Sequence, residues 1–155
     1  MATAIVVYDA WYGCTQAVAE EVARGLSSDG RVATVVANVK TVNARQVLGH
    51  DIIVVGSPDH DGRPTERIRR LLEQLRTVDL RGRRFVFFDT CFGPAHGRAV
   101  GKMEAILRDR NPFVSPWFLS LSVLVRRPHG PLLAGEISKC RALGHSIRTG
   151  LAVPA

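Results

Sequence analysis

The hydrophobic residues of this chain fall into short β-branched runs that alternate with longer stretches of helical period. Five runs are typical of strands and span residues 3–8, 31–37, 51–56, 85–88 and 117–125. The segments between them repeat apolar residues every three or four positions. This spacing predicts amphipathic helices over residues 15–26, 43–48, 64–75, 100–107 and 136–151.

The alternation of strands and helices is typical of parallel βαβ units. Residues 52–55 form a continuous apolar run, which indicates a strand that is buried on both faces near the centre of a sheet. Right-handed crossovers leave few arrangements of such units. Five strands interleaved with helices fit two parallel-sheet families. Of the few remaining topologies we favour an α/β fold with a doubly wound, five-stranded parallel sheet in the order 2-1-3-4-5, with helices on both faces, as one domain over residues 1–155.

Length and composition narrow the class of protein further. At 155 residues the chain has the usual size of one domain. No apolar run approaches the roughly 20 residues that a membrane helix needs, and no secretory signal precedes the first strand. The three cysteines are odd in number and far apart, which favours reduced thiols. The sequence contains no close Cys/His cluster of the kind that would indicate a metal site. We expect a cytoplasmic protein without membrane insertion.

The loop after the first predicted strand has the features of an anion site. Gly13 lets the backbone approach a ligand closely, and a helix that begins near Thr15 directs its first N–H groups and its positive end at the same point. The hydroxyls of Tyr12 and Thr15 are further candidate donors. The P-loop and dinucleotide glycine patterns are absent, which disfavours ATP and NAD. The alternative is a plain βα turn that only closes the strand and caps the helix.

Residues 6–15 resemble the opening of single-domain bacterial flavodoxins, in which Tyr-(Glu/Asp)-Ser-x-(Phe/Tyr)-Gly-Asn-Thr precedes the first helix. Later segments agree with this resemblance. Residues 51–58 are similar to the third strand of the family and its Gly-x-Pro turn, and residues 88–90 to the end of its fourth strand. Residues 130–136 are similar to the Gly-Pro-Leu-x-x-Gly-Glu entry to its last helix. The similarity follows the whole chain in order, and 2-1-3-4-5 is the flavodoxin-like strand order.

The resemblance implies a protein that binds flavin mononucleotide (FMN) and carries electrons between a reductase or ferredoxin-like donor and an acceptor. It puts the phosphate at the first loop and the isoalloxazine ring between the loops after strands three and four. The predicted cofactor-binding residues are Ala10, Trp11, Tyr12, Gly13, Cys14, Thr15, Ser57, Pro58, Asp59, His60, Asp61, Gly62, Thr90, Cys91, Phe92, Gly93 and His96. No residue is plainly a general base or nucleophile, so no catalytic residue is predicted, and an FMN-dependent reductase stays an open alternative.

Two residues of the first loop depart from the family pattern. Ala10 stands where the family has a serine hydroxyl, and Cys14 where it has an asparagine amide. Each lost hydrogen bond to a charged group costs about 1.5–3 kcal/mol, or roughly ten- to a hundredfold in affinity. The backbone donors of the loop remain.

The two later loops carry the groups that would contact the ring. Gly62 and its polar neighbours offer backbone that could change its hydrogen bonding when flavin N5 gains a proton, while Phe92 and His96 offer stacking surfaces. Trp11 and Tyr12 are further aromatic candidates. Each of these aromatic residues could instead simply pack on the core, and histidines in loops are more often solvated than functional.

The charge of the chain points to its partners. The net charge is +7, and eight arginines fall between residues 63 and 84. We favour a solvated helix face that steers an acidic redox partner, rather than nucleic acid. The alternative is a cofactor-free binding module that uses this basic surface. A thiol phosphatase based on Cys91 is less favoured because six residues, rather than the five of tyrosine phosphatases, separate Cys91 from Arg98.

Overall fold

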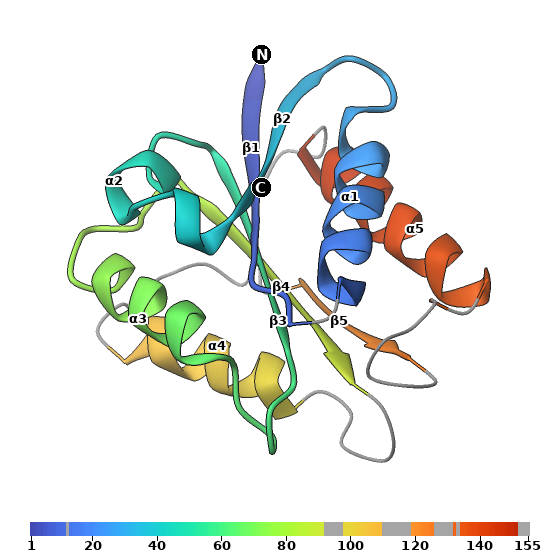
Figure 1. Cartoon of the computed structure of the whole chain (residues 1–155). Helices are drawn as coiled ribbons and strands as arrows, with labels where there is room; N and C mark the ends of the chain where they lie inside the picture. Colours follow the sequence, from blue (N-terminus) through green and yellow to red (C-terminus); the bar gives the residue numbers. More distant parts are fainter. Residues whose placement is uncertain (12, 92–97, 110–118, 126–131, 133, 152–155) are drawn as a thin grey trace.

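A computed structural model describes residues 1–11, 13–91, 98–109, 119–125, 132 and 134–151 of the chain. Its parallel sheet has the order β2-β1-β3-β4-β5, which confirms the predicted topology (Figure 1). The strands are β1 (Ala2–Tyr8), β2 (Val32–Asn38), β3 (Ile52–Pro58), β4 (Arg84–Cys91) and β5 (Leu119–Leu124).

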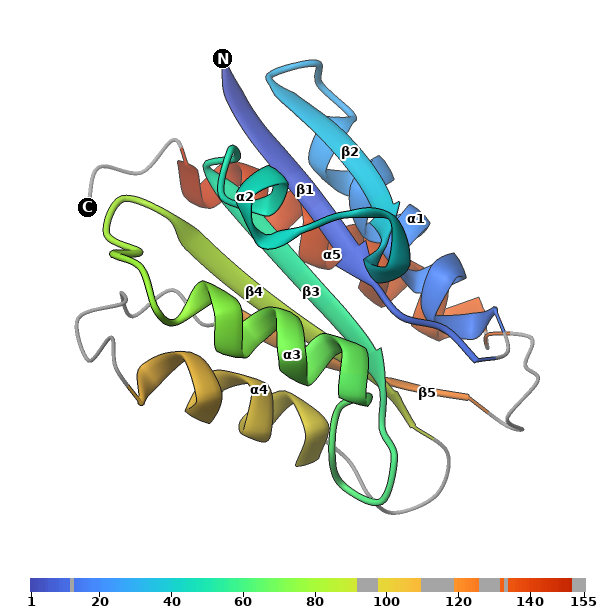
Figure 2. The same cartoon turned by 60° about the vertical axis from the view of Figure 1, so that its left-hand side comes forward.

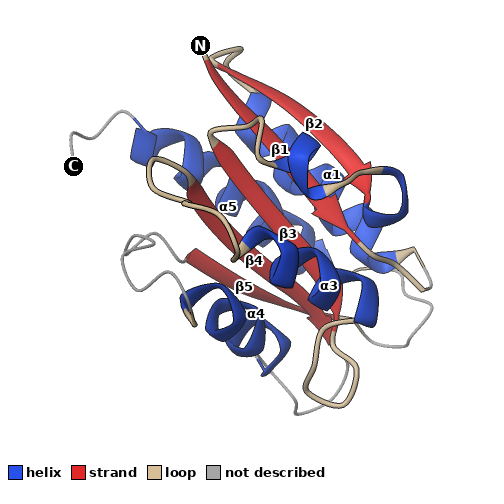
Figure 3. Cartoon of the chain, turned by 90° about the vertical axis from the view of Figure 1, so that its left-hand side faces the viewer, coloured by secondary structure: helices blue, strands red, loops and turns tan. Residues whose placement is uncertain are grey.

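Helices cover both faces of the sheet, as predicted. They are α1 (Cys14–Ser27), α2 (Ala44–Val47), α3 (Glu66–Leu75), α4 (Arg98–Arg108) and α5 (Ala134–Leu151), with a short 3₁₀ helix η1 (Val39–Thr41) that the sequence analysis did not predict. Helices α1 and α5 lie on one face, and α2, α3 and α4 on the other (Figures 2 and 3). In the part of the chain that the structure describes, no helix is long and apolar enough to cross a membrane.

The core lies in two layers, one on each side of the sheet. Ile52 and Val54 belong to the layer beneath α1 and α5, whereas Ile53 and Val55 belong to the layer beneath α3 and α4. All four side chains are fully buried. Alternate residues of a strand point to opposite faces, so a strand covered on both sides needs apolar residues at every position. This is why the continuous run of residues 52–55 correctly predicted the central strand.

Most boundaries lie within two residues of the predicted ones, and three of the differences bear on the site. Helix α3 begins at Glu66 and Thr65 is its N-cap, so Pro64 precedes the helix rather than standing in its first turn. Strand β3 continues through Ser57 and Pro58, which pair with Asp89 and Thr90 of β4, and β4 continues to Cys91, which pairs with Leu124 of β5. The helix stop predicted at residues 111–112 and the first two residues of the predicted fifth strand lie outside the described residues.

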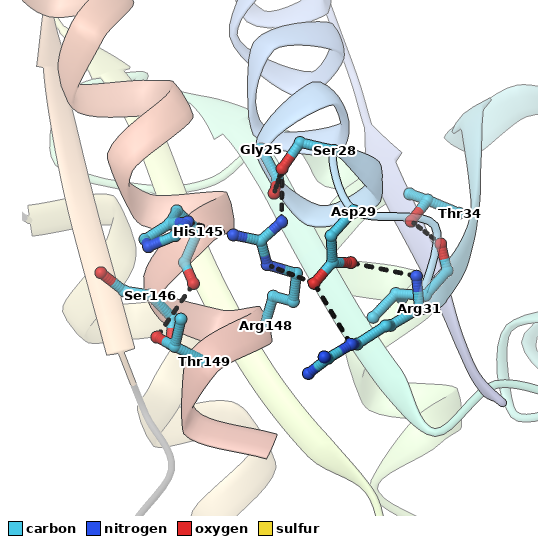
Figure 4. Close-up of polar contacts among 10 residues, drawn as sticks. Gly25, Ser28, Asp29, Arg31, Thr34, His145, Ser146, Arg148 and Thr149 are labelled. Atoms are coloured by element: carbon cyan, nitrogen blue, oxygen red, sulfur yellow. Dashed lines mark hydrogen bonds and ion pairs between the residues drawn. The ribbon is translucent and has the colours of Figure 1, made fainter. Parts of the chain in front are cut away.

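Helices α1 and α5 approach each other through glycine. A methyl group at Gly144 of α5 would lie 2.2 Å from the carbonyl oxygen of Val22 in α1, so no larger residue fits. At the end of the same interface, Arg148 of α5 forms an ion pair with Asp29, whose carboxylate is 3.5 Å away, and also donates to the Ser28 hydroxyl (Figure 4). The close backbone contact and this ion pair hold α1 against α5, and they thereby help to set the position of the first turn of α1 relative to the sheet.

Candidate functional site

The carboxyl ends of β1 and β3 meet the amino ends of α1 and α3 at one edge of the sheet. The chain leaves β1 at Asp9, whose N–H donates to the carbonyl oxygen of Gly56 in β3 at 3.1 Å. Strand β1 leads to β2 on one side, while β3 and β4 lie on its other side. In an open parallel sheet, such a switch point forms a crevice in which ligands bind.

The start of α1 is open to an anion. Gly13 is its N-cap with φ of +88°, and no side chain caps the helix. The first helical hydrogen bond joins the N–H of Ala17 to the carbonyl of Gly13 at 3.1 Å, so the amides of residues 15 and 16 have no acceptor within the helix. The first turn carries no acidic residue that would occupy the positive end of the helix dipole. A methyl group at Gly13 would meet no atom within 4 Å, so glycine is needed there for its backbone angle rather than for space.

The side chains at the start of α1 differ in what they offer a ligand. Burial raises the pKa of the Cys14 thiol, so at neutral pH this residue is uncharged and does not repel an anion. Thr15 is only 2% exposed, and its hydroxyl is hydrogen-bonded to that of Thr90 in β4 at 3.0 Å. Ala10 packs against the core layer beneath α1 and α5. Thr15 and Ala10 thus anchor the loop to the sheet, and among its described residues the backbone is left as the main donor.

A buried carboxylate beneath the loop was missed by the sequence analysis. Asp9 is fully buried, and its Oδ1 accepts from the N–H of Ala10 at 3.0 Å. Its Oδ2 accepts from the Thr65 hydroxyl at 2.8 Å and lies 3.8 Å from the guanidinium of Arg67. Thr65 in turn caps α3 by accepting from the N–H of Ile68. The threonine that precedes the apolar period of α3 was a usable N-cap signal, but nothing local to it indicated its contact with Asp9.

Residues 59–63 form a tight hairpin beside this loop. His60 and Arg63 exchange both backbone hydrogen bonds, at 2.8 and 3.0 Å, around Asp61 and Gly62, which have positive φ angles of 50° and 81°. The Asp-Gly pair is the usual signal for such a turn. Asp59 Oδ1 accepts from the N–H of Gly62 at 2.7 Å and closes the turn from inside. The hairpin is therefore a preformed rather than an adaptable element.

The hairpin and the first loop contact each other through aromatic rings. The ring centroids of Trp11 and His60 are 4.8 Å apart, with the planes at 79°. Trp11 is 46% exposed, which is unusual for so large an apolar side chain. Asp59 also donates its N–H to the carbonyl of Thr90 at 2.8 Å, so the hairpin is bonded to the end of β4 as well. Three segments distant in sequence thus converge at this edge.

Two predicted site residues are engaged within the protein. Ser57 is fully buried, and its hydroxyl donates to the carbonyl of Pro58 while accepting from the N–H of Thr65, both at 2.9 Å. Cys91 is 3% exposed, and burial, followed by the charges of Asp89 and Asp59, raises its pKa to about 11. A thiol that stays protonated at neutral pH is a poor nucleophile, which disfavours the phosphatase alternative. Four other predicted residues, Tyr12, Phe92, Gly93 and His96, lie outside the described residues.

Solved structures match this arrangement over nearly the whole chain. A flavodoxin from the domain Archaea has a TM-score of 0.78 and 21% identity, covering 97% of this chain and 99% of its own. The chain has the flavodoxin fold. Oxidised Flavodoxin 1 from Bacillus cereus gives a TM-score of 0.78 at 18% identity, covering 98% and 99% of the two chains. The Flv1 flavodiiron core from Synechocystis sp. PCC6803 gives 0.77 at 21% identity, covering 97% of this chain but 36% of that one.

No family model and no curated protein sequence matches the chain. The flavodoxin fold brings the described part of the predicted site together at a single edge of the sheet. The first loop, the hairpin and the end of β4 are joined by the pairs Trp11–His60, Thr15–Thr90 and Asp59–Thr90.

Proposed function

We propose that this chain binds FMN at the carboxyl edge of its sheet and serves as an electron carrier. The observation that carries the proposal is the open start of α1. The amides of residues 15 and 16 lack acceptors within the helix, the first turn carries no acidic residue, and no described atom lies within 4 Å of where a methyl group at Gly13 would stand. These features suit a dianionic phosphate, which accepts several N–H hydrogen bonds at once.

The surroundings of this loop also suit the ring of FMN. Trp11 presents an exposed aromatic face, and the hairpin of residues 59–63 stands next to it. Asp59 Oδ2 is buried and has no hydrogen-bond partner among the described residues, while the isoalloxazine ring carries N–H groups that need acceptors. We assign the phosphate to the backbone of residues 10–15, and the ring to Trp11 and the hairpin.

FMN supplies reversible uptake of electrons and protons at its ring when it is bound. The protein contributes binding, orientation and electrostatics. Asp59 Oδ1 holds the N–H of Gly62 and so fixes which backbone groups of the turn face outward. The carboxylates of Asp59 and Asp61 oppose added negative charge in this region, whereas the cations of Arg63 and Arg67 favour it. No described side chain is arranged as a nucleophile, which favours a carrier over an enzyme with its own substrate chemistry.

A pair of glycine variants tests the phosphate assignment. Gly13 and Gly82 both have positive φ, at +88° and +84°, and both would accept a methyl group without any contact within 4 Å. Substitution by alanine therefore imposes similar backbone strain at both, about 1–2 kcal/mol. Gly82 lies just before β4, whose other end belongs to the site. We expect FMN fluorescence to be quenched by the wild-type protein, with roughly tenfold or more weaker binding in Gly13→Ala and unchanged binding in Gly82→Ala.

Riboflavin provides the chemical control because it has the same ring but no phosphate. Its affinity is expected to be equal in all three proteins. If Gly13→Ala and Gly82→Ala bind FMN alike, the phosphate does not lie at the start of α1. If the wild-type protein fails to quench FMN at micromolar concentrations, the cofactor proposal is wrong, although the fold is unaffected.

A further inference from the structure

A groove of about 550 Å³ opens between α3 and α4, next to the hairpin of residues 59–63. Its lining includes His60, Arg63, Arg69, Lys102 and Ile106. Helices α3 and α4 lie side by side on the same face of the sheet (Figure 2). The groove is thus a neighbour of the candidate site, with which it shares His60 and Arg63 of the hairpin, and its other lining residues lie outside that site.

The groove carries positive charge that the protein does not neutralise. Arg63 and Lys102 are exposed, and neither forms an ion pair within the described ranges. Arg69 differs because it is paired with both Glu66 and Glu73. These pairs form along α3 itself and leave the cations at the groove mouth unbalanced.

The acidic side of the balance is small. Glu66 is the acidic residue of the lining, and it is shared between Arg69 and Arg70. Both arginines belong to α3 and lie within about two helical turns of the hairpin along the chain. Glu66 is therefore already neutralised, and the lining presents a net positive charge to anything that enters the groove.

The floor of the groove and the adjacent hairpin of residues 59–63 suit a protein partner. Ile106 is half-buried and packs against the core layer beneath α3 and α4, and Pro64 and Ala105 add further apolar surface. An apolar floor with a charged rim is the usual composition of a transient protein interface. Arg98, at the start of α4, lays its aliphatic stem on the hairpin, with Cδ 3.2 Å from where a methyl group at Gly62 would stand. A partner seated here would touch the hairpin that borders the proposed flavin site.

We propose that this groove, with Arg63 and Lys102 at its mouth, is the docking surface for an acidic redox protein. The inference rests on the proposed function, because it names the class of partner that would exchange electrons at that site. Three observations favour an acidic redox protein as the occupant. They are the positive charge of the groove, the net charge of +7, and the continuity of the groove with the hairpin. Opposite charges around such an interface mainly raise the association rate and select the partner.

An acidic [2Fe–2S] ferredoxin is a suitable probe. We expect it to bind the wild-type protein in calorimetry at low ionic strength, and to bind less tightly as salt is added. Arg63→Gln/Lys102→Gln should weaken this binding about tenfold, since two exposed charge pairs with the partner are lost.

Arg24→Gln/Arg31→Gln is the matched control. It also removes two positive charges, but from exposed residues in and just after α1 (Arg31 is drawn in Figure 4). Each of these arginines shares its carboxylate with a second arginine, Arg141 on Glu21 and Arg148 on Asp29, so neither acidic group is left unpaired. We expect the control to lower ferredoxin affinity by less than about twofold, through net charge alone.

Three results would overturn the docking proposal. They are equal losses in the two double variants, no ferredoxin binding at low salt, and tighter binding of duplex DNA than of ferredoxin with the same dependence on Arg63 and Lys102. FMN quenching, measured on the same preparations, decides the proposed cofactor independently. Ferredoxin binding that persists without FMN binding would separate the two proposals.

Discussion

Thr65→Val is expected to destabilise the protein by about 2–3 kcal/mol, because it breaks the contact between α3 and the buried Asp9. Valine has nearly the shape of threonine, so the change leaves no cavity. It removes the hydroxyl that donates to Asp9 Oδ2 at 2.8 Å and that accepts from the N–H of Ile68 at 3.4 Å. A hydrogen bond to a charged group contributes about 1.5–3 kcal/mol. The cap is long and adds about 0.5 kcal/mol, the low end for an N-cap.

The remaining partners of Asp9 keep this loss below that of an isolated buried charge. Its other oxygen still accepts from the N–H of Ala10, and Arg67 is still 3.8 Å away. A small domain has about 5–15 kcal/mol of stability, so the variant should stay folded.

Urea unfolding followed by circular dichroism measures the effect. With a slope of about 1.5–2 kcal/mol per molar urea, the midpoint should fall by about 1–2 M. Thr65→Ser retains the hydroxyl and is the control, with an expected loss below about 1 kcal/mol from its missing methyl group. Hydrogen exchange at Ala10 and Ile68 should accelerate in the valine variant. A valine variant within about 0.5 kcal/mol of wild type, or one no less stable than the serine variant, would refute the assigned role of Thr65.

The other predictions concern helix packing and thiol chemistry. Gly144→Ala should lower the unfolding free energy by about 1–3 kcal/mol, because its methyl group would meet the backbone of α1. The control Gly101→Ala has open space around it and should raise the unfolding free energy by up to about 1 kcal/mol. If Gly144→Ala is more stable than wild type in urea unfolding, the close packing is contradicted. Burial raises the pKa of Cys91 and Cys140 to about 11 from an ordinary value of 9.0, so both should resist iodoacetamide at pH 8 in the folded protein, as mass spectrometry would detect. Because the pKa of each thiol is higher in the folded than in the unfolded protein, the protonated thiols contribute their full stability below about pH 9. As the pH rises from 9 to 11, the free energy of unfolding should fall by about 1.4 kcal/mol per pH unit and thiol. Cys140→Ala should make this fall less steep, and an unchanged slope would contradict the raised pKa.

The sequence by itself determined the architecture, because the signals for it are local. The continuous apolar run of residues 52–55 marked the central strand. The period of the apolar residues marked each helix except for the 3₁₀ helix η1, which is too short to have one. Backbone geometry and the burial of every second or every third to fourth residue act over a few positions, so one sequence suffices to detect them.

The contacts that build the candidate site were decided only by the tertiary structure. Asp9 and Thr65 are 56 positions apart, and Thr15 and Thr90 are 75 apart, so no local pattern could pair them. The same holds for the strand ends. Thr90 and Cys91 read as loop residues, yet they extend β4 because partners in β3 and β5 offer them hydrogen bonds.

The basic groove shows the same division most clearly. The sequence revealed an excess of arginines between residues 63 and 84, but most of those on α3 are neutralised by glutamates one turn away. Within the described lining of the groove, the cations that form no ion pair are Arg63 and Lys102, and the sequence analysis did not single out Lys102. Net charge is a sum over residues, whereas a charged surface depends on which side chains find partners. Only packing α4 against α3 brings these two cations to one mouth.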